Sequence, residues 1–193
     1  MKREKAFPER IHRRKSVARE IAYIGVAVAL ITVCAWISVP VFSIPFTLQT
    51  FAVALVGGLL GWKRGTAAIL VYILMGLIGI PVFSGFKAGV PALFGATGGY
   101  IFGFLFLCLL PALAKLIPAY NGAARTMVFY CFSILGCAVL YFFGTVWLIL
   151  MTRCAVGYAL GVCVVPFIIP DAVKLALSAL VTVRLDRHIT YSI

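Results

Sequence analysis

The sequence predicts an all-α integral membrane protein: a bundle of six transmembrane helices with both termini in the cytoplasm. Three observations support this fold class. Hydrophobic residues make up 64% of the 193 residues and charged residues only 11%, whereas a soluble domain carries about 25% charged residues to cover its core. Apolar runs of about 20 residues, the length needed to cross a bilayer, recur along the chain. Basic residues fall between these runs mainly on one predicted side.

The six spans follow from the apolar runs and from the proline and glycine residues beside them. We expect spans at residues 20–39, 45–61, 65–80, 99–116, 125–152 and 165–183. Pro40 ends the first run, and Pro45 suits the first turn of the second helix. A short turn over residues 62–65 separates the second and third spans. The apolar outer connections, residues 40–45 and 81–99, are expected to fold back over the bundle as a lid or as a packed plug.

Basic residues indicate which ends of the spans face the cytoplasm. Eight of the 17 Lys and Arg residues precede residue 20. The connections on the same side carry Lys63, Arg64, Lys115 and Arg125. The other connections carry only Lys87 and Arg153. Because cytoplasmic loops are enriched in Lys and Arg, we expect a basic cytoplasmic tail over residues 1–19, a six-helix membrane domain over residues 20–185 and a cytoplasmic tail over residues 186–193.

Composition excludes several classes of function. The net charge of +12 does not indicate a nucleic-acid-binding protein, because no base-reading motif accompanies the basic residues. The cysteines are scattered, and the two histidines, His12 and His188, lie in opposite tails, so we expect no metal site and no cofactor. The sequence has no phosphate-binding loop. Energy for any transport must therefore come from a partner, an ion gradient or the substrate's own gradient.

Asp171 is the one acidic residue predicted at membrane depth. Lys174 follows three positions later, and residues at i and i+3 share one face of a helix. Ionisable groups in the hydrocarbon layer are costly and mark functional sites that face the interior. The pair therefore suits a small molecule that offers an amide- or urea-like group. Two alternatives stay open: an ion pair that only orients the last helix, and a proton or ion site at Asp171.

Other candidate binding residues lie in the outer half of the predicted bundle. Gln49 offers an amide that can bind a ligand or cap an outer helix turn. Lys87 lies in an outer connection, where it can meet an anionic substrate or a lipid headgroup. Four aromatic residues can form the apolar walls of a pocket or belong to the interfacial belt: Trp36, Phe46, Phe83 and Tyr100.

Four segments together resemble the BioY family, the biotin-specific S component of energy-coupling factor (ECF) transporters. The segments are Ile-Pro-Phe-Thr-Leu-Gln-Thr-Phe at residues 44–51, Gly-Leu-Ile-Gly-Ile-Pro-Val-Phe at 76–83, Gly-Ala-Thr-Gly-Gly-Tyr at 95–100 and Asp-Ala-Val-Lys at 171–174. They occur in the order of the family and cover nearly the whole membrane domain. The resemblance implies a six-helix bundle that binds biotin near its outer face, in a pocket roofed by loops.

The resemblance also implies roles for individual residues. Asp171 would accept hydrogen bonds from the ureido N–H groups of biotin, and Lys174 would donate to the ureido carbonyl. Aromatic walls would hold the thiophane ring and the aliphatic tail, which leaves the biotin carboxylate to the outer loop that carries Lys87. Two positions depart from the family pattern, since Pro170 stands where Gly is frequent and Ala96 replaces a common Pro.

The family resemblance implies partners as well. S components work with a transmembrane T component and two ATPase subunits in a prokaryotic plasma membrane. Contact with the T component uses an A-x-x-x-A motif in the first helix. Two pairs of small residues match that spacing here, Ala18 with Ala22 and Gly25 with Ala29, and small residues let helices approach closely in a membrane.

Rival functions stay open at this point. The nearest is an S component for another vitamin, such as thiamine or riboflavin. A proton-coupled carrier is a second rival, and a membrane enzyme with Asp171 as acid or base is a third. An enzyme is disfavoured because Asp171 is the one acidic residue predicted at membrane depth, and no histidine and no nucleophile–base constellation accompany it there.

Overall fold

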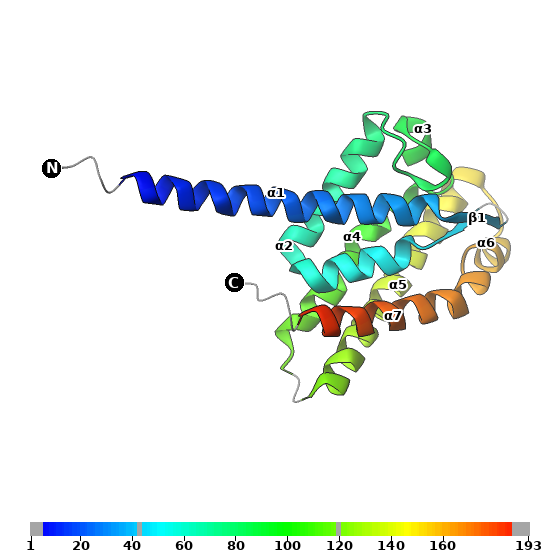
Figure 1. Ribbon diagram of the computed structural model, residues 1–193. Helices are drawn as coiled ribbons and strands as arrows, with labels where there is room; N and C mark the ends of the chain where they lie inside the picture. Colours follow the sequence, from blue (N-terminus) through cyan, green and yellow to red (C-terminus); the bar gives the residue numbers. More distant parts are fainter. Residues whose placement is uncertain (1–5, 42–43, 119–120, 187–193) are drawn as a thin grey trace.

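The computed structural model describes residues 6–41, 44–118 and 121–186. The elements, in chain order, are α1 (Ala6–Trp36), β1 (Ser38–Val41), β2 (Ile44–Thr47), α2 (Gln49–Leu77), η1 (Ser84–Phe86), α3 (Gly89–Leu93), α4 (Gly98–Leu113), η2 (Ala114–Leu116), α5 (Gly122–Thr152), α6 (Val156–Cys163), η3 (Val165–Phe167) and α7 (Ile168–Asp186). Residues 6–19 of the predicted basic tail continue α1 as helix, and α1 extends beyond the bundle (Figure 1). The rest of that tail and the predicted tail from residue 187 onward lie outside the described residues.

Five helical segments in the described part of the chain are long and apolar enough to cross a membrane: Val17–Trp36, Gln49–Leu77, Gly98–Leu116, Gly122–Thr152 and Val156–Asp186. The first predicted span matches the membrane-length part of α1, Val17–Trp36, within three residues. The fourth and fifth predicted spans match α4 and α5 within three residues. The predicted second and third spans form one element, α2. The expected turn over residues 62–65 is wrong, because these residues are helical, and Pro45 lies in strand β2 rather than in a helical turn.

Helix α2 folds back on itself at Gly61. Gly61 has φ 74° and ψ 178°, a conformation that only glycine adopts readily, and it interrupts the helix. Gln49 Nε2 donates a hydrogen bond to the Tyr72 hydroxyl at 2.8 Å. In a straight helix these residues would lie about 34 Å apart, at 1.5 Å per residue. Element α2 therefore consists of two arms, residues 49–60 and 62–77, which lie side by side with the chain reversed between them.

The first arm of α2 packs against α4 at backbone distance. A Cβ atom on Gly57 would lie 2.0 Å from the carbonyl oxygen of Cys108 in α4, so a side chain cannot fit there. Such close packing is typical of membrane helices, which associate through small residues. Element α2 also contacts α1 and α7, while α5 contacts both α4 and α7. The two arms of α2 thereby join the long helices into one bundle.

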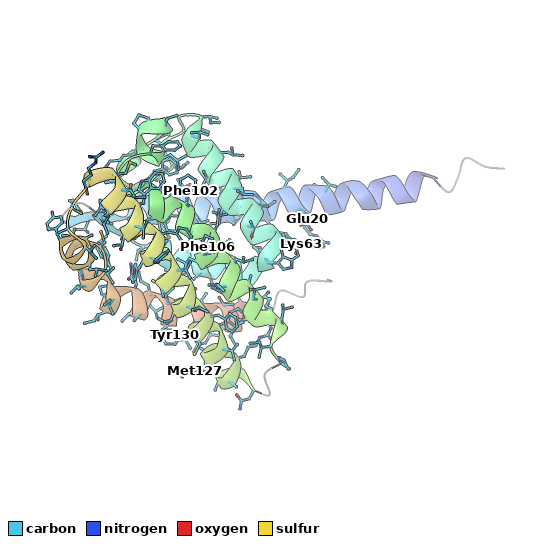
Figure 2. All side chains as sticks on the ribbon, turned by 180° about the vertical axis from the view of Figure 1, so that it is seen from behind. Glu20, Lys63, Phe102, Phe106, Met127 and Tyr130 are labelled. Atoms are coloured by element: carbon cyan, nitrogen blue, oxygen red, sulfur yellow. The ribbon has the colours of Figure 1, made fainter. Side chains whose placement is uncertain are left out.

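Ion pairs connect the helices at the end of the bundle where α2 turns back. Arg64 pairs with Glu20, which lies where α1 leaves the bundle (Figure 2). Asp186 at the end of α7 accepts from Lys115 at 3.0 Å and from Arg125 at 2.6 Å. These residues come from five elements, so this end, which we call the Gly61 end, is fixed by charge as well as by packing.

The opposite end of the bundle carries the irregular elements. Strands β1 and β2 pair antiparallel, with Ser38 opposite Thr47 and Pro40 opposite Pro45. This hairpin, α3 and α6 gather at the right-hand end in Figure 1. The outer connections predicted over residues 40–45 and 81–99 thus contain a hairpin, η1 and α3. Helix α6 was not predicted, because it lies in the same apolar run as α7.

Candidate functional site

A cavity opens between the helices at the hairpin end. Its empty space, with the open mouth included, is about 760 Å³. Its wall is built by β2, both arms of α2, the segment from η1 to α3, and helices α4 to α7. All six predicted substrate-binding residues line it: Asp171, Lys174, Gln49, Tyr100, Phe83 and Lys87.

Asp171 and Lys174 form the charged part of the wall. They lie one turn apart near the start of α7, and Lys174 Nζ is 2.5 Å from Asp171 Oδ1. Both residues are buried, with 3% and 7% of their surface exposed. A buried charge is tolerated only when it is paired and hydrogen-bonded. The same-face arrangement that the spacing predicted is therefore present, and it faces a cavity.

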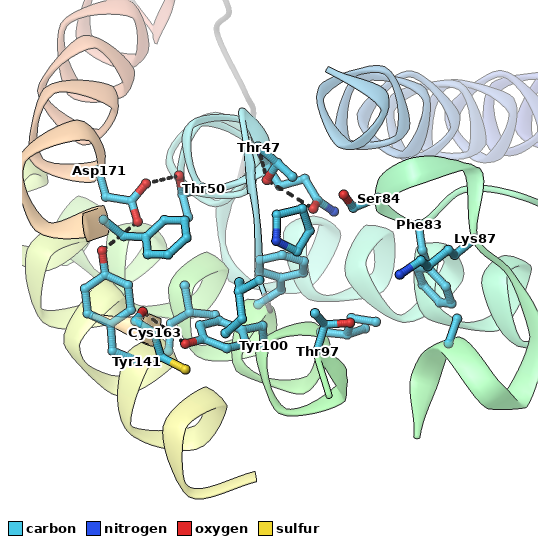
Figure 3. Close-up of a pocket in the computed structure, with 18 of the residues that line it drawn as sticks. Thr47, Thr50, Phe83, Ser84, Lys87, Thr97, Tyr100, Tyr141, Cys163 and Asp171 are labelled. Atoms are coloured by element: carbon cyan, nitrogen blue, oxygen red, sulfur yellow. Dashed lines mark hydrogen bonds between the residues drawn. The ribbon is translucent and has the colours of Figure 1, made fainter. Parts of the chain in front are cut away.

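Two hydroxyl groups complete the surroundings of Asp171. Thr50 Oγ1 donates to Asp171 Oδ1 at 2.8 Å, and the Tyr141 hydroxyl donates to Oδ2 at 2.6 Å (Figure 3). Oδ1 thus has two donors, Thr50 and Lys174, while Oδ2 has one. Each carboxylate oxygen can accept about two hydrogen bonds. Asp171 Oδ2 therefore has the capacity to accept a further N–H from a ligand.

Lys174 also binds strand β2. Its ammonium group donates to the carbonyl oxygen of Thr47 at 2.8 Å and lies 4.1 Å from the centroid of the Phe46 ring. With Asp171, these are three partners for the three N–H groups of an ammonium ion. Lys174 therefore fastens the hairpin to α7, and a ligand carbonyl can bind Lys174 only by replacing one of these partners.

The amide of Gln49 is held within the wall of the cavity. Its Nε2 donates to the Tyr72 hydroxyl at 2.8 Å, and its Oε1 accepts from Thr47 Oγ1 at 3.2 Å. The Tyr72 hydroxyl in turn donates to the carbonyl oxygen of Val82 at 3.1 Å. Gln49 therefore connects β2, both arms of α2 and the segment after α2.

Aromatic residues line the middle of the cavity. Tyr100 donates its hydroxyl hydrogen to the carbonyl oxygen of Cys163 at 3.2 Å, which joins α4 to α6. Phe83 packs edge-on against Tyr72, with ring centroids 5.5 Å apart. The other two predicted wall aromatics, Trp36 and Phe46, are not among the lining residues. Phe46 lies instead beside the Lys174 ammonium group.

Lys87 and Ser84 form a second polar region. They lie on the opposite side of the cavity from Asp171 (Figure 3). Lys87 is exposed at the mouth. Ser84 Oγ is shielded from solvent and has no hydrogen-bond partner among the residues that the structure describes. A buried polar group without a partner is uncommon in folded proteins, and this one lies at the cavity wall, where a ligand can supply the partner.

Comparison with known families identifies the chain. The BioY family profile matches residues 4–191. The chain belongs to the BioY family. A probable biotin transporter BioY of Pyrococcus horikoshii is 40% identical over 88% of this chain and 97% of that protein. The biotin transporter BioY of Thermotoga maritima is 38% identical over 88% of this chain and 96% of its own length.

A solved structure extends the match to three dimensions. The crystal structure of the S-component for biotin from an ECF-type ABC transporter superposes with a TM-score of 0.79, at 27% identity. The match covers 91% of this chain and 94% of that chain. The BioY fold thus accounts for nearly all of the described helices, and this BioY chain is a multi-pass membrane protein.

The predicted docking residues of this BioY chain lie away from the cavity. Ala18, Ala22, Gly25 and Ala29 are all exposed and are spaced along one face of α1. A Cβ atom on Gly25 would have no atom within 4 Å. The face of α1 that carries these small residues is therefore not covered by the described part of the chain.

Proposed function

We propose that this chain is the biotin-binding S component of an ECF-type uptake transporter. The observation that carries the proposal is the buried Asp171–Lys174 pair at the wall of an apolar cavity, in a chain whose relatives are named biotin transporters. The family consists of transporter components, so the chain is not an enzyme. Its task is to hold a small molecule without changing it.

The chemistry of the cavity suits the parts of biotin. Asp171 Oδ2 accepts an N–H of the ureido ring, because it has the remaining acceptor capacity. Lys174 receives the ureido carbonyl by exchange with the carbonyl oxygen of Thr47. The thiophane ring and the aliphatic tail pack against the aromatic side chains of Phe83 and Tyr100. The carboxylate of biotin then reaches the second polar region, where Lys87 supplies the positive charge.

We further propose six membrane crossings, with both termini in the cytoplasm and the cavity on the outer side. The folded shape of α2 supports this number, since β2 with the first arm forms one crossing and the second arm forms another. The distribution of charge supports the orientation. Arg64, Lys115 and Arg125 take part in ion pairs at the Gly61 end, whereas the cavity end carries Lys87 and Arg153. The end that is richer in Lys and Arg, the Gly61 end, faces the cytoplasm of a prokaryotic cell.

Transport driven by ATP requires partners, because the chain has no nucleotide-binding motif. We propose a transmembrane T component and two ATPase subunits as these partners. The exposed small residues on α1 provide a surface to which a partner helix can approach closely. Ala18 with Ala22, or Gly25 with Ala29, would form the contact, while the cavity stays accessible at the other end of α1.

The deciding experiment is titration calorimetry on the purified chain in detergent, with thiamine and riboflavin as controls. Tight binding of biotin, with no heat from the other two vitamins, is the expected result. Tight binding of thiamine or riboflavin instead would assign the cavity to another vitamin. Binding of none of the three would remove the proposed function and leave the BioY fold without its ligand.

A further inference from the structure

The segment that forms one rim of the cavity has an unusual backbone. We call residues 81–87 the rim loop, since it supplies Phe83, Ser84 and Lys87 to the cavity wall. Gly85 and Phe86 both have positive φ, 68° and 58°. A bulky residue with positive φ is an outlier that local sequence does not favour. Contacts from outside the loop must therefore hold its conformation.

Two aromatic side chains from different helices hold adjacent carbonyl groups of the rim loop. Trp36 Nε1 at the end of α1 donates to the carbonyl oxygen of Pro81 at 2.8 Å. The Tyr72 hydroxyl in the second arm of α2 donates to the next carbonyl oxygen, that of Val82, at 3.1 Å. Both carbonyl groups are thus fixed by side chains from outside the loop.

Each of these two residues also packs against an aromatic ring of the same loop. The rings of Trp36 and Phe86 are stacked, with centroids 5.0 Å apart. Tyr72 meets Phe83 edge-on at 5.5 Å. The Phe83 ring lies over Gly76, where a Cβ atom would be only 2.0 Å from the ring. The stacked Trp36 thereby supports the residue with the unfavourable φ, and Tyr72 supports the residue that lines the cavity.

We propose that Trp36 and Tyr72 are positioning residues that act as a two-point clamp, fixing the rim loop over the cavity and thereby slowing the release of the ligand. Trp36 lies outside the cavity lining. Tyr72 is part of the lining, but its hydroxyl already accepts from Gln49 and donates to Val82, so neither residue needs to form a polar contact with the ligand. The inference rests on the proposed function only in the choice of biotin as the ligand whose release is measured.

The test compares Trp36→Phe, Tyr72→Phe and the double variant with the wild-type chain. Each Phe keeps an aromatic ring and removes one hydrogen bond to the loop, and Tyr72→Phe also removes the hydrogen bond from Gln49 Nε2. We expect Trp36→Phe to release radiolabelled biotin roughly three- to tenfold faster, as for one lost hydrogen bond. Tyr72→Phe should accelerate release at least as much, and both variants should keep the wild-type association rate. Opening at either point frees the same loop. The acceleration of biotin release in the double variant should therefore be smaller than the product of the accelerations in the two single variants. Trp62→Phe, a change at an exposed tryptophan of the Gly61 end, is the matched control and should leave release unchanged.

Hydrogen exchange of the rim-loop amides, measured without ligand, separates the clamp from the proposed function. Faster exchange in both single variants but not in Trp62→Phe is expected even if the wild-type chain fails to bind biotin, which would overturn only the proposed function. Unchanged exchange in the rim loop overturns the clamp, and so do unchanged release rates or multiplicative effects in the double variant. If Tyr72→Phe fails to fold, Trp36→Phe decides the matter, since Trp36 is 39% exposed.

Discussion

Replacing Asp171 by Asn changes the charge of the cavity wall while keeping its shape. The carboxylate accepts from Lys174, Thr50 and Tyr141, and an Asn side chain can offer only one oxygen to these donors and to the ligand. A hydrogen bond from a ligand N–H to a charged group contributes about 1.5–3 kcal/mol. Losing it corresponds to a roughly 10- to 150-fold higher Kd for biotin.

The same change leaves Lys174 buried without an anionic partner. Removing one member of a buried ion pair costs about 3–5 kcal/mol of folding free energy. We therefore expect Asp171→Asn to lower the apparent melting temperature as well as the affinity. The two effects separate in titration calorimetry at a temperature where the variant is fully folded, because the fitted stoichiometry reports the folded fraction and the curvature reports Kd.

Asp186→Asn is the matched control for this prediction. Asp186 also has two cationic partners, Lys115 and Arg125, but it lies at the Gly61 end, away from the cavity. The control should lose stability and keep the wild-type affinity for biotin. Wild-type affinity in Asp171→Asn, or an equal loss of affinity in both variants, would refute the assignment of the ureido ring to Asp171.

Three further predictions test other parts of the molecule. Ser84→Ala should weaken the binding of biotin about three- to tenfold and that of biotin methyl ester less; an equal loss in titrations of both ligands would show that Ser84 does not contact the carboxylate. Ala22→Leu should prevent co-purification with the T component and leave biotin affinity unchanged, whereas intact co-purification would exclude this face of α1. Gly57→Ala should lower the free energy of unfolding by about 1–3 kcal/mol, because the new methyl group meets the Cys108 carbonyl oxygen. The loss would be seen as a lower apparent melting temperature. Gly25 has open space around it, so Gly25→Ala should cause no such loss.

The charged part of the site could be predicted, because acidic residues are rare in membrane spans. A lone acidic residue in an apolar run stands out, and helical spacing places Lys174 on its face. Tyr141 could not be predicted in the same way, because a tyrosine in an apolar helix is equally suited to packing or to the interface, and only the tertiary structure brings its hydroxyl to Asp171. Thr50 lay in a segment already singled out, but the sequence did not indicate which of its residues faces inward.

The fold was predictable to a similar extent. The basic residues Lys63 and Arg64 indicated a turn between two spans, whereas the chain reverses at Gly61 and these two residues are helical. So sharp a reversal could not be predicted, since helix continues on both sides of one glycine. The pairing of Pro40 with Pro45 in a hairpin could not be predicted, for a different reason. Proline lacks the N–H that a strand ladder uses and is confined to strand edges, so its presence favoured a loop over the hairpin that the structure contains.

The late start of α2 explains why there is room for a cavity at all. Its first arm, residues 49–60, is about 18 Å long, well short of the roughly 30 Å of a hydrocarbon core. The four residues of β2 add about 13 Å, so strand and arm together reach the required length. Because a strand is thinner than a helix, space is left beside it, and its carbonyl groups need partners such as Lys174. The binding space is therefore the volume that one missing stretch of helix would have filled.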